Sequence, residues 1–221
     1  MSHNHSTHKL LLALYISACA SSVAHAQNLI TNGDFTAGNT GFSSGYSFVT
    51  TNIAVSEYGV VTDPKNWNPS LFSFADHTNN ATGSRNMLVA NGSTTPDVTI
   101  WSQTVAVTPS RNYLFSGWIS SAYNVNAPAN EFFAGTVSLG TINPIIITPG
   151  TWAFFSGNWN SGSSTSVSLR LRDNNLESNG NDVAVDDLSF TATAVPESGT
   201  LPFILLTALI PLAKYSRRRM S

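Results

Sequence analysis

The stretch "TSVSLRLRD", residues 165–173, alternates between polar and apolar side chains from Ser166 to Arg172. Successive residues of an extended chain point to opposite faces of a sheet. The stretch therefore separates into one apolar face and one polar face: Val167, Leu169 and Leu171 against Ser168, Arg170 and Arg172. This pattern predicts a β-strand whose apolar face lies in a core and whose polar face meets water.

Similar short runs recur along the chain, each bounded by Gly, Asn, Pro or Asp: "NMLVANG" (86–92), "VTIWSQTVAV" (98–107), "NYLFSGWIS" (112–120), "FFAGTVSLG" (132–140), "TWAFFSGNW" (151–159) and "DVAVDDLSF" (182–190). Helical periodicity is nearly absent. Seven or more short antiparallel strands predict an all-β sandwich, and we assign it to residues 27–193. Trp101, Trp118 and Trp152 lie on predicted strands, so we expect them in the core.

The composition of this body excludes several classes of function. Residues 27–197 hold 8 Asp and 4 Glu against 1 Lys and 4 Arg, a net charge of 5 − 12 = −7. Nucleic-acid phosphates require clustered basic residues, so nucleic-acid binding is not expected. Cys19 is the only cysteine and precedes the body. The body therefore contains no disulfide, thiol nucleophile or cysteine-ligated zinc. His77 is its only histidine, which excludes a multi-histidine metal site.

The N-terminus has the order of features found in a secretory signal peptide, residues 1–26. Lys9 precedes an apolar run, and Ala24-His25-Ala26 follows it. This order predicts export by the Sec machinery and cleavage between Ala26 and Gln27. A second possibility stays open, because residues 16–19 resemble a lipobox that would leave a lipid on Cys19.

The C-terminus, "AVPESGTLPFILLTALIPLAKYSRRRMS" (194–221), combines a polar turn, an apolar run and a basic end. The apolar run 201–213 would be about 20 Å long as a helix, which is short against a hydrocarbon core of about 30 Å. We predict a single membrane helix over about 201–215. The basic tail 217–219 would then lie on the cytoplasmic side and the body outside.

This tail resembles the PEP-CTERM sorting signal of Gram-negative bacteria. The motif covers residues 195–200, followed by the helix and the basic tail: Val195, Pro196, Glu197, Ser198, then Arg217, Arg218 and Arg219. Ser198 replaces the last proline of the usual Val-Pro-Glu-Pro. The resemblance implies an exosortase as partner, transient residence in the inner membrane, cleavage near the motif and delivery to the cell surface. Such proteins tend to occur in bacteria that make exopolysaccharide.

The body resembles galactose-binding-like jelly rolls, which include many carbohydrate-binding modules. Four stretches carry the resemblance: "NLITNGDFTAGNTGF" (28–42) as an opening strand, "IWSQTVAVTPSRNYLFSGW" (100–118), "PGTWAFFSGNW" (149–159) and "GNDVAVDDLSF" (180–190) as a closing strand. The resemblance implies one structural calcium held by Asp34 and Asp186, although Thr36 stands where these folds often have a glutamate. Asp186 shares the parity of Leu188 and Phe190, so we expect it to face inward. The alternative is that Asp34 caps a turn and Asp186 accepts backbone N–H groups.

Sugar binding on a β-sandwich usually depends on exposed aromatic faces with amides beside them. Trp67 lies in the loop "TDPKNWNPS" (62–70) between Asn66 and Asn68, where no strand is expected to bury it. Tyr58 is a further ligand-binding candidate, supported by Tyr46 and Tyr123. A second interpretation stays open, in which Trp67 folds back onto the core.

The sequence thus predicts an exported, non-catalytic protein of the cell surface or biofilm matrix that binds exopolysaccharide. A structural or adhesive surface protein without sugar affinity is the alternative, and a carbohydrate-active enzyme is a further one. No nucleophile elbow is present, and no catalytic residue is predicted. His77, between Asp76 and Thr78, is expected to be a structural hydrogen-bonding residue.

Overall fold

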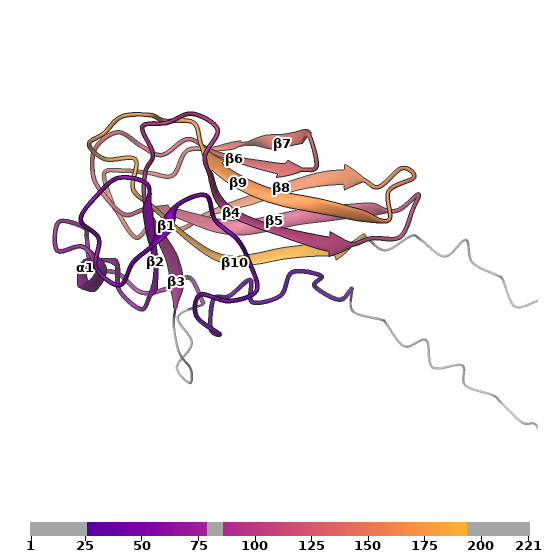
Figure 1. Ribbon diagram of the computed structural model, residues 1–221, viewed down its shortest axis with the longest axis horizontal. Helices are drawn as coiled ribbons and strands as arrows, with labels where there is room; N and C mark the ends of the chain where they lie inside the picture. The colour runs from indigo at the N-terminus through magenta and orange to yellow at the C-terminus, as the bar shows by residue number, and fades with distance from the viewer. Residues whose placement is uncertain (1–25, 79–85, 194–221) are drawn as a thin grey trace, which may run out of the picture.

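A computed structural model describes residues 26–78 and 86–193 (Figure 1). Residues 1–25 and 194–221 lie outside these ranges, so the signal peptide, the lipobox at Cys19, the sorting motif and the membrane helix stay predictions. Among the described residues, no helix is both long and apolar enough to cross a membrane.

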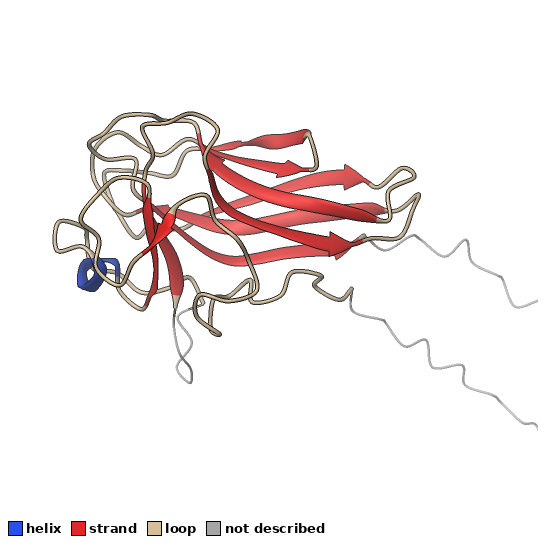
Figure 2. Ribbon diagram, viewed as in Figure 1, coloured by secondary structure: helices blue, strands red, loops and turns tan. Residues whose placement is uncertain are grey.

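Ten strands in the described residues form two sheets, and the helical content is a single turn (Figure 2). The six-stranded sheet has the order β1-β2-β3-β10-β5-β8, with these bounds: β1 Ser47–Phe48, β2 Glu57–Val61, β3 Met87–Asn91, β10 Val183–Ala192, β5 Asn112–Ser121 and β8 Ala153–Asn160. The four-stranded sheet has the order β4-β9-β6-β7: β4 Thr99–Ala106, β9 Ser166–Asp173, β6 Asn130–Ala134 and β7 Val137–Ile142. The predicted all-β sandwich is confirmed.

The strand runs read from the sequence correspond to observed strands, with two exceptions. "FFAGTVSLG" spans a hairpin, because Gly135, with a φ of 62°, turns β6 into β7. The stretch 28–42 forms no regular strand and contacts β10 through an isolated bridge between Asn28 and Thr191. All pairings are antiparallel except β1 with β2, which is parallel. Neither β1, β2 nor the short helix was predicted.

The main core lies between the two sheets and is strongly aromatic. Phe132 and Phe155 stack with ring centroids 3.9 Å apart, and Phe115 meets Phe132 edge-on at 5.1 Å. Trp101 is fully buried here, as predicted. The apolar face of β9, with Val167, Leu169 and Leu171, also lies in this core, which confirms the pattern of the opening stretch.

A second, smaller core lies on the outer face of the six-stranded sheet. It is covered by the loop that contains helix α1, Pro64–Trp67. The Asp63 side chain accepts the backbone N–H of Lys65, and Pro64 occupies the first helical turn, which is the expected chemistry of a helix start. The helix directs Trp67 onto the sheet, against Met87 and Val89 of β3 and Ala184 of β10.

A β-bulge interrupts β10 between Asp186 and Ser189, where Asp187 has a φ of 49°. Before the bulge, Val185 faces the main core and Asp186 pairs with Trp118 on the outer face. After it, Leu188 and Phe190 face the main core. The prediction that Asp186 shares a face with Leu188 and Phe190 is therefore wrong, because the extra residue reverses the parity of the strand, although Asp186 is fully buried.

Candidate functional site

Three cross-strand pairs between β5 and β8 form an open surface on the outer face of the six-stranded sheet. The register pairs Trp118 with Phe154, Ser116 with Ser156, and Leu114 with Asn158. We call these six residues the open strip. Directly opposed residues in an antiparallel pair share one face, so the six side chains lie in three successive rows. Helix α1 and its loop cover the β3 side of this sheet, and in the strip they contact Trp118 through His77.

The first row of the open strip, Trp118 and Phe154, is aromatic. Phe154 is 52% exposed, and its ring centroid lies 5.0 Å from that of the partly exposed Trp118. His77 stacks on Trp118 at 3.8 Å with an interplanar angle of 15°. Trp152 meets His77 edge-on at 5.9 Å, and its Nε1 donates to the Ala75 carbonyl at 3.3 Å. The strip therefore ends against an aromatic wall of His77 and Trp152.

His77 is held in place by the closing strand. Its Nδ1 lies 2.7 Å from Oδ2 of Asp187, and Thr78 donates its hydroxyl to the same carboxylate at 2.9 Å. The stack on Trp118 fixes the plane of the ring. These contacts agree with the predicted structural, hydrogen-bonding role of His77.

Asp186 lies beneath His77 and is fully buried. Its Oδ2 accepts the backbone N–H of His77 at 3.0 Å, and its Oδ1 accepts that of Asp187 at 2.8 Å. Burial, and next the charge of Asp187, raise the pKa of Asp186 to about 8, with Asp76 adding a smaller effect in the same direction. The two backbone donors act in the opposite direction. Asp186 therefore anchors the 76–78 turn to the sheet.

The predicted ligand residues lie elsewhere, and most are not accessible. Trp67 is 0% exposed, and its Nε1 donates to the Val49 carbonyl at 3.0 Å, so the prediction that it offers a sugar-stacking face is wrong. Tyr58 is buried, with its hydroxyl donating to Asn39 at 2.8 Å. Asn66 is exposed, whereas Asn68 is half-buried and donates to Asn52.

Two tryptophans predicted for the core lie instead at the surface site. Trp118 is partly exposed and belongs to neither core, so its prediction is wrong, whereas Trp152 is partly exposed but packs against the second core. A signal was available for Trp118, because it lies on the opposite face of β5 from the buried Tyr113, Phe115 and Ile119. Trp152 precedes β8 by one residue, and its position depends on the 74–77 turn that packs against it.

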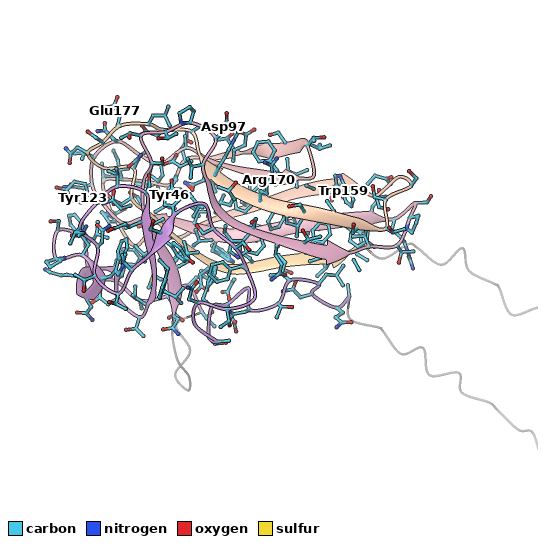
Figure 3. All side chains as sticks on the ribbon, in the orientation of Figure 1. Tyr46, Asp97, Tyr123, Trp159, Arg170 and Glu177 are labelled. Carbon is cyan, nitrogen blue, oxygen red and sulfur yellow. The ribbon has the colours of Figure 1, made fainter. Side chains whose placement is uncertain are left out.

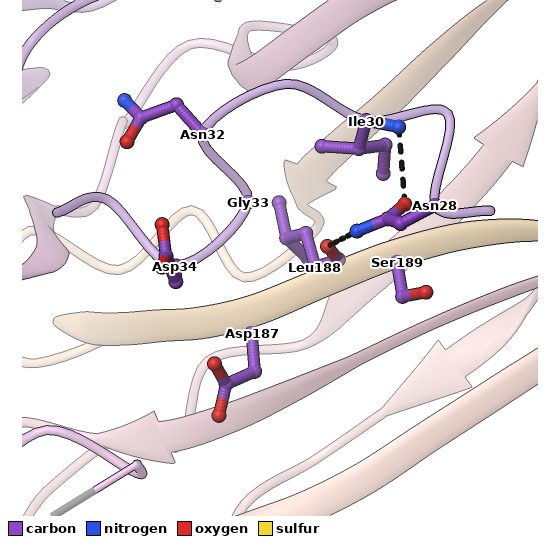
Figure 4. Close-up of a pocket in the computed structure, with 8 residues that line it drawn as sticks. All are labelled: Asn28, Ile30, Asn32, Gly33, Asp34, Asp187, Leu188 and Ser189. Carbon is purple, nitrogen blue, oxygen red and sulfur yellow. Dashed lines mark hydrogen bonds between the residues drawn. The ribbon is translucent and has the colours of Figure 1, made fainter. Parts of the chain in front are cut away.

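The predicted calcium ligands do not form a site together. Asp34 borders a cavity of about 430 Å³ with Asp187, not with Asp186 (Figure 4). Its Oδ1 accepts the N–H and hydroxyl of Thr36 at 3.3 and 3.0 Å, which is the turn-capping alternative. Within residues 26–78 and 86–193, no three His, Cys, Asp or Glu side chains are grouped to hold a metal. We therefore assign no ion to Asp34 and Asp186.

No protein-family model and no curated protein sequence matches this chain. Among solved structures, it is similar to the N-terminal CBM22-1-CBM22-2 tandem domain from Paenibacillus barcinonensis Xyn10C. The TM-score is 0.50 at 13% identity, over 80% of this chain and 49% of that one, so the chain spans about half of the tandem.

Two further solved structures resemble most of this chain at lower TM-scores. A cyclase from Fischerella sp. TAU has a TM-score of 0.46 at 15% identity, over 75% of this chain and 96% of that one. A family 16 carbohydrate-binding module has a TM-score of 0.41 at 14% identity, over 74% and 99%. Structural neighbours thus include carbohydrate-binding modules with a jelly-roll fold, and at such identities the likeness concerns the fold alone.

Proposed function

We propose that this protein is a non-catalytic, polysaccharide-binding domain and that the open strip is its binding surface. The observation that carries the proposal is the pairing of Phe154 with Trp118 at the surface, next to rows of hydroxyl and amide side chains. Among the exposed aromatic residues described, Phe154 has the largest exposed fraction. An aromatic face left in water is available to stack on the apolar face of a sugar ring.

The second and third rows of the open strip supply the hydrogen-bonding groups that sugar recognition needs beside an aromatic ring. Ser116, Ser156 and Asn158 can each donate and accept hydrogen bonds with sugar hydroxyls. The first and third rows are four residue positions apart along each strand, a distance of about 14 Å. A surface of this length is longer than one sugar ring, so we propose a polysaccharide chain as the ligand.

The sequence features at the two ends supply the proposed location. A signal peptide would direct export by the Sec machinery, and a PEP-CTERM tail would direct sorting by an exosortase to the cell surface. Exopolysaccharide is the polymer that a protein delivered there would meet. Mass spectrometry of the mature protein tests this part, because processing predicts a start at Gln27 and loss of residues after the 195–197 motif. A mature form that still ends at Ser221 would contradict it.

Binding is tested with a glycan array and an exopolysaccharide pull-down on wild-type protein, Phe154→Ala and Trp118→Ala. We expect each substitution to weaken binding by about 5- to 150-fold, since stacking on an aromatic side chain contributes about 1–3 kcal/mol per ring in nucleic-acid-binding platforms. Phe48→Ala is the matched control, because Phe48 is 46% exposed on β1 of the same sheet, away from the strip. Equal binding by all four proteins, or none by the wild type, would overturn the proposal.

A further inference from the structure

Four polar side chains are buried at one end of the sandwich. In the sequence they lie far from the turn around Asp34. Asn130 begins β6, Asp173 ends β9, and Asn181 and Asp182 directly precede β10. We call these four residues the polar end cluster. Asn130 and Asp173 are directly opposed in the β6–β9 pair, on the face that also carries the buried Phe132 and Leu171.

Each residue of the polar end cluster has a buried oxygen without a hydrogen-bond partner. The four side chains are 0–6% exposed. The atoms concerned are Oδ1 of Asn130, Oδ2 of Asp173, Oδ1 of Asn181 and Oδ1 of Asp182, and the amide nitrogen Nδ2 of Asn130 is buried without a partner as well. Buried polar atoms in proteins are nearly always satisfied, and a buried carboxylate requires a cation or several donors. The unsatisfied oxygens of two carboxylates and two amides on neighbouring segments therefore indicate a missing partner.

The remaining atoms of these side chains are already fixed by the surrounding loops. Oδ1 of Asp173 accepts the N–H groups of Ala129 and Asn175 at 2.6 and 3.0 Å. Nδ2 of Asn181 donates to the Asn175 carbonyl at 2.7 Å, and its backbone N–H donates to Asn126 at 2.7 Å. The segments 126–130, 173–175 and 181–182 are thus tied together. None of these hydrogen bonds involves the four unsatisfied oxygens.

The two carboxylates of the cluster act on each other electrostatically. Burial, with a contribution from the Asp173 charge, raises the pKa of Asp182. Tyr46 (Figure 3) lies within reach of both, since burial and next the Asp173 charge raise the pKa of its phenol, with a further contribution from Asp182. Among the residues described, no Lys or Arg ion pair involves either carboxylate. Two buried carboxyl groups thus belong to the cluster without a basic partner among the described residues.

From these observations we propose that the polar end cluster binds a divalent cation, and that calcium is the ion that suits it. Two carboxylates balance a charge of 2+, and the four oxygens are hard ligands of the kind calcium takes from Asp and Asn. Calcium prefers six to eight oxygens, which neighbouring carbonyls or water complete. Nitrogen and sulfur ligands, which zinc favours, do not belong to the cluster.

The first test measures the thermal unfolding of the full-length chain with EGTA and with CaCl₂. At a calcium concentration 100-fold above Kd, we expect a Tm rise of about 5–10 °C. Asp182→Asn should abolish most of the rise. Asp34→Asn is the matched control, an acid-to-amide change at the other end of the chain, and should keep it. An unchanged Tm for wild type, or a rise lost in Asp34→Asn and kept in Asp182→Asn, would overturn the assignment.

A gain-of-ligand variant distinguishes a cation from buried water. Asn130→Asp adds a third carboxylate and should tighten calcium binding by roughly tenfold in calorimetric titration. Without a cation, the extra buried charge would lower stability and calcium would not restore it, which would count against the proposal. Terbium luminescence sensitised by Tyr46 gives a readout independent of stability. We expect calcium to displace the signal and Tyr46→Phe to weaken it.

Discussion

Trp67 and Trp118 lie on the same side of the same sheet, yet their surroundings differ completely. Trp67 belongs to a short helix in a loop and is fully buried, with its indole N–H satisfied by Val49. Trp118 belongs to a central strand and is partly exposed beside Phe154. The loop residue is in a core, and the strand residue is at the surface.

This contrast shows that the cover over a sheet face decides whether its aromatic residues are buried. On the β3 side, the 62–78 loop closes over the sheet and creates the second core. On the β8 side, His77 stacks on Trp118, whereas Phe154, Ser156 and Asn158 of the open strip are exposed. The covered half should therefore contribute to stability and the open half to binding, and the following substitutions test that division.

Trp67→Ala should have the largest effect on stability. It removes a fully buried indole and leaves both a cavity and an unsatisfied Val49 carbonyl, at a cost of about 3–5 kcal/mol in the free energy of unfolding. Urea denaturation measures the loss. Ile53→Ala is a control in the neighbouring loop, because Ile53 is 88% exposed, and it should cost little. If the two variants were equally stable, Trp67 would not be part of a core.

Gly59→Ala should have the next largest effect, because it introduces a methyl group beneath Trp67. A Cβ at Gly59 would lie 2.5 Å from Nε1 and 2.7 Å from Cδ1 of Trp67. The bond to Val49 prevents the ring from withdrawing, so we expect a loss of about 1–3 kcal/mol. In a Trp67→Ala background this loss should shrink, and a double-mutant cycle measures the coupling. If the losses from Gly59→Ala and Trp67→Ala were additive, the cost of Gly59→Ala would not come from contact with Trp67.

Asp186 is buried between the covered half and the open half of the sheet. Its titration should make the stability of the protein depend on pH. Its pKa is about 8 in the folded protein against 3.8 as the ordinary value, so the folded state binds the proton more tightly. The protonated carboxyl group therefore contributes to the free energy of unfolding fully below about pH 4, and this contribution is lost as the pH rises to about 8. Asp186→Asn should flatten the decline in Tm over this range. Glu177→Gln changes an exposed acid as control. Parallel Tm curves for the wild type and Asp186→Asn would contradict this assignment.

Phe154→Ala should have the smallest effect on stability, less than about 1 kcal/mol, because half of the ring is already in water. The same substitution should have a large effect on polysaccharide binding. Measuring unfolding and affinity on one protein sample separates the two quantities. A large loss of stability would mean that the open strip is a structural surface.

The alternation of side chains was enough to predict most of the sandwich. In β9, a single period-2 pattern identified both the strand and its buried face, since each residue's direction depends only on its neighbours; in β5, the pattern identified the strand but not which face is buried. The Asp186 prediction was wrong because one extra residue at Asp187 reverses the parity, and the local pattern contains no sign of it.

The candidate site was harder to predict, because exposure depends on contacts between distant segments. Trp67 lacks a strand pattern, and its burial requires the 62–78 loop to fold back over β3. Trp118 is contacted by His77 of that loop and is still partly exposed. The polar end cluster joins residues 130, 173 and 181–182, and only the folded chain shows that their oxygens lack partners.

The position of β10 has a consequence for the order in which the molecule can fold. As the last strand in sequence, β10 lies between β3 and β5 and forms hydrogen bonds with both. Until it is present, the six-stranded sheet consists of two unconnected parts, β1-β2-β3 and β5-β8, each with an open edge. A growing chain therefore cannot complete this domain before about residue 192 has been made, and the sheet forms late, by long-range pairing.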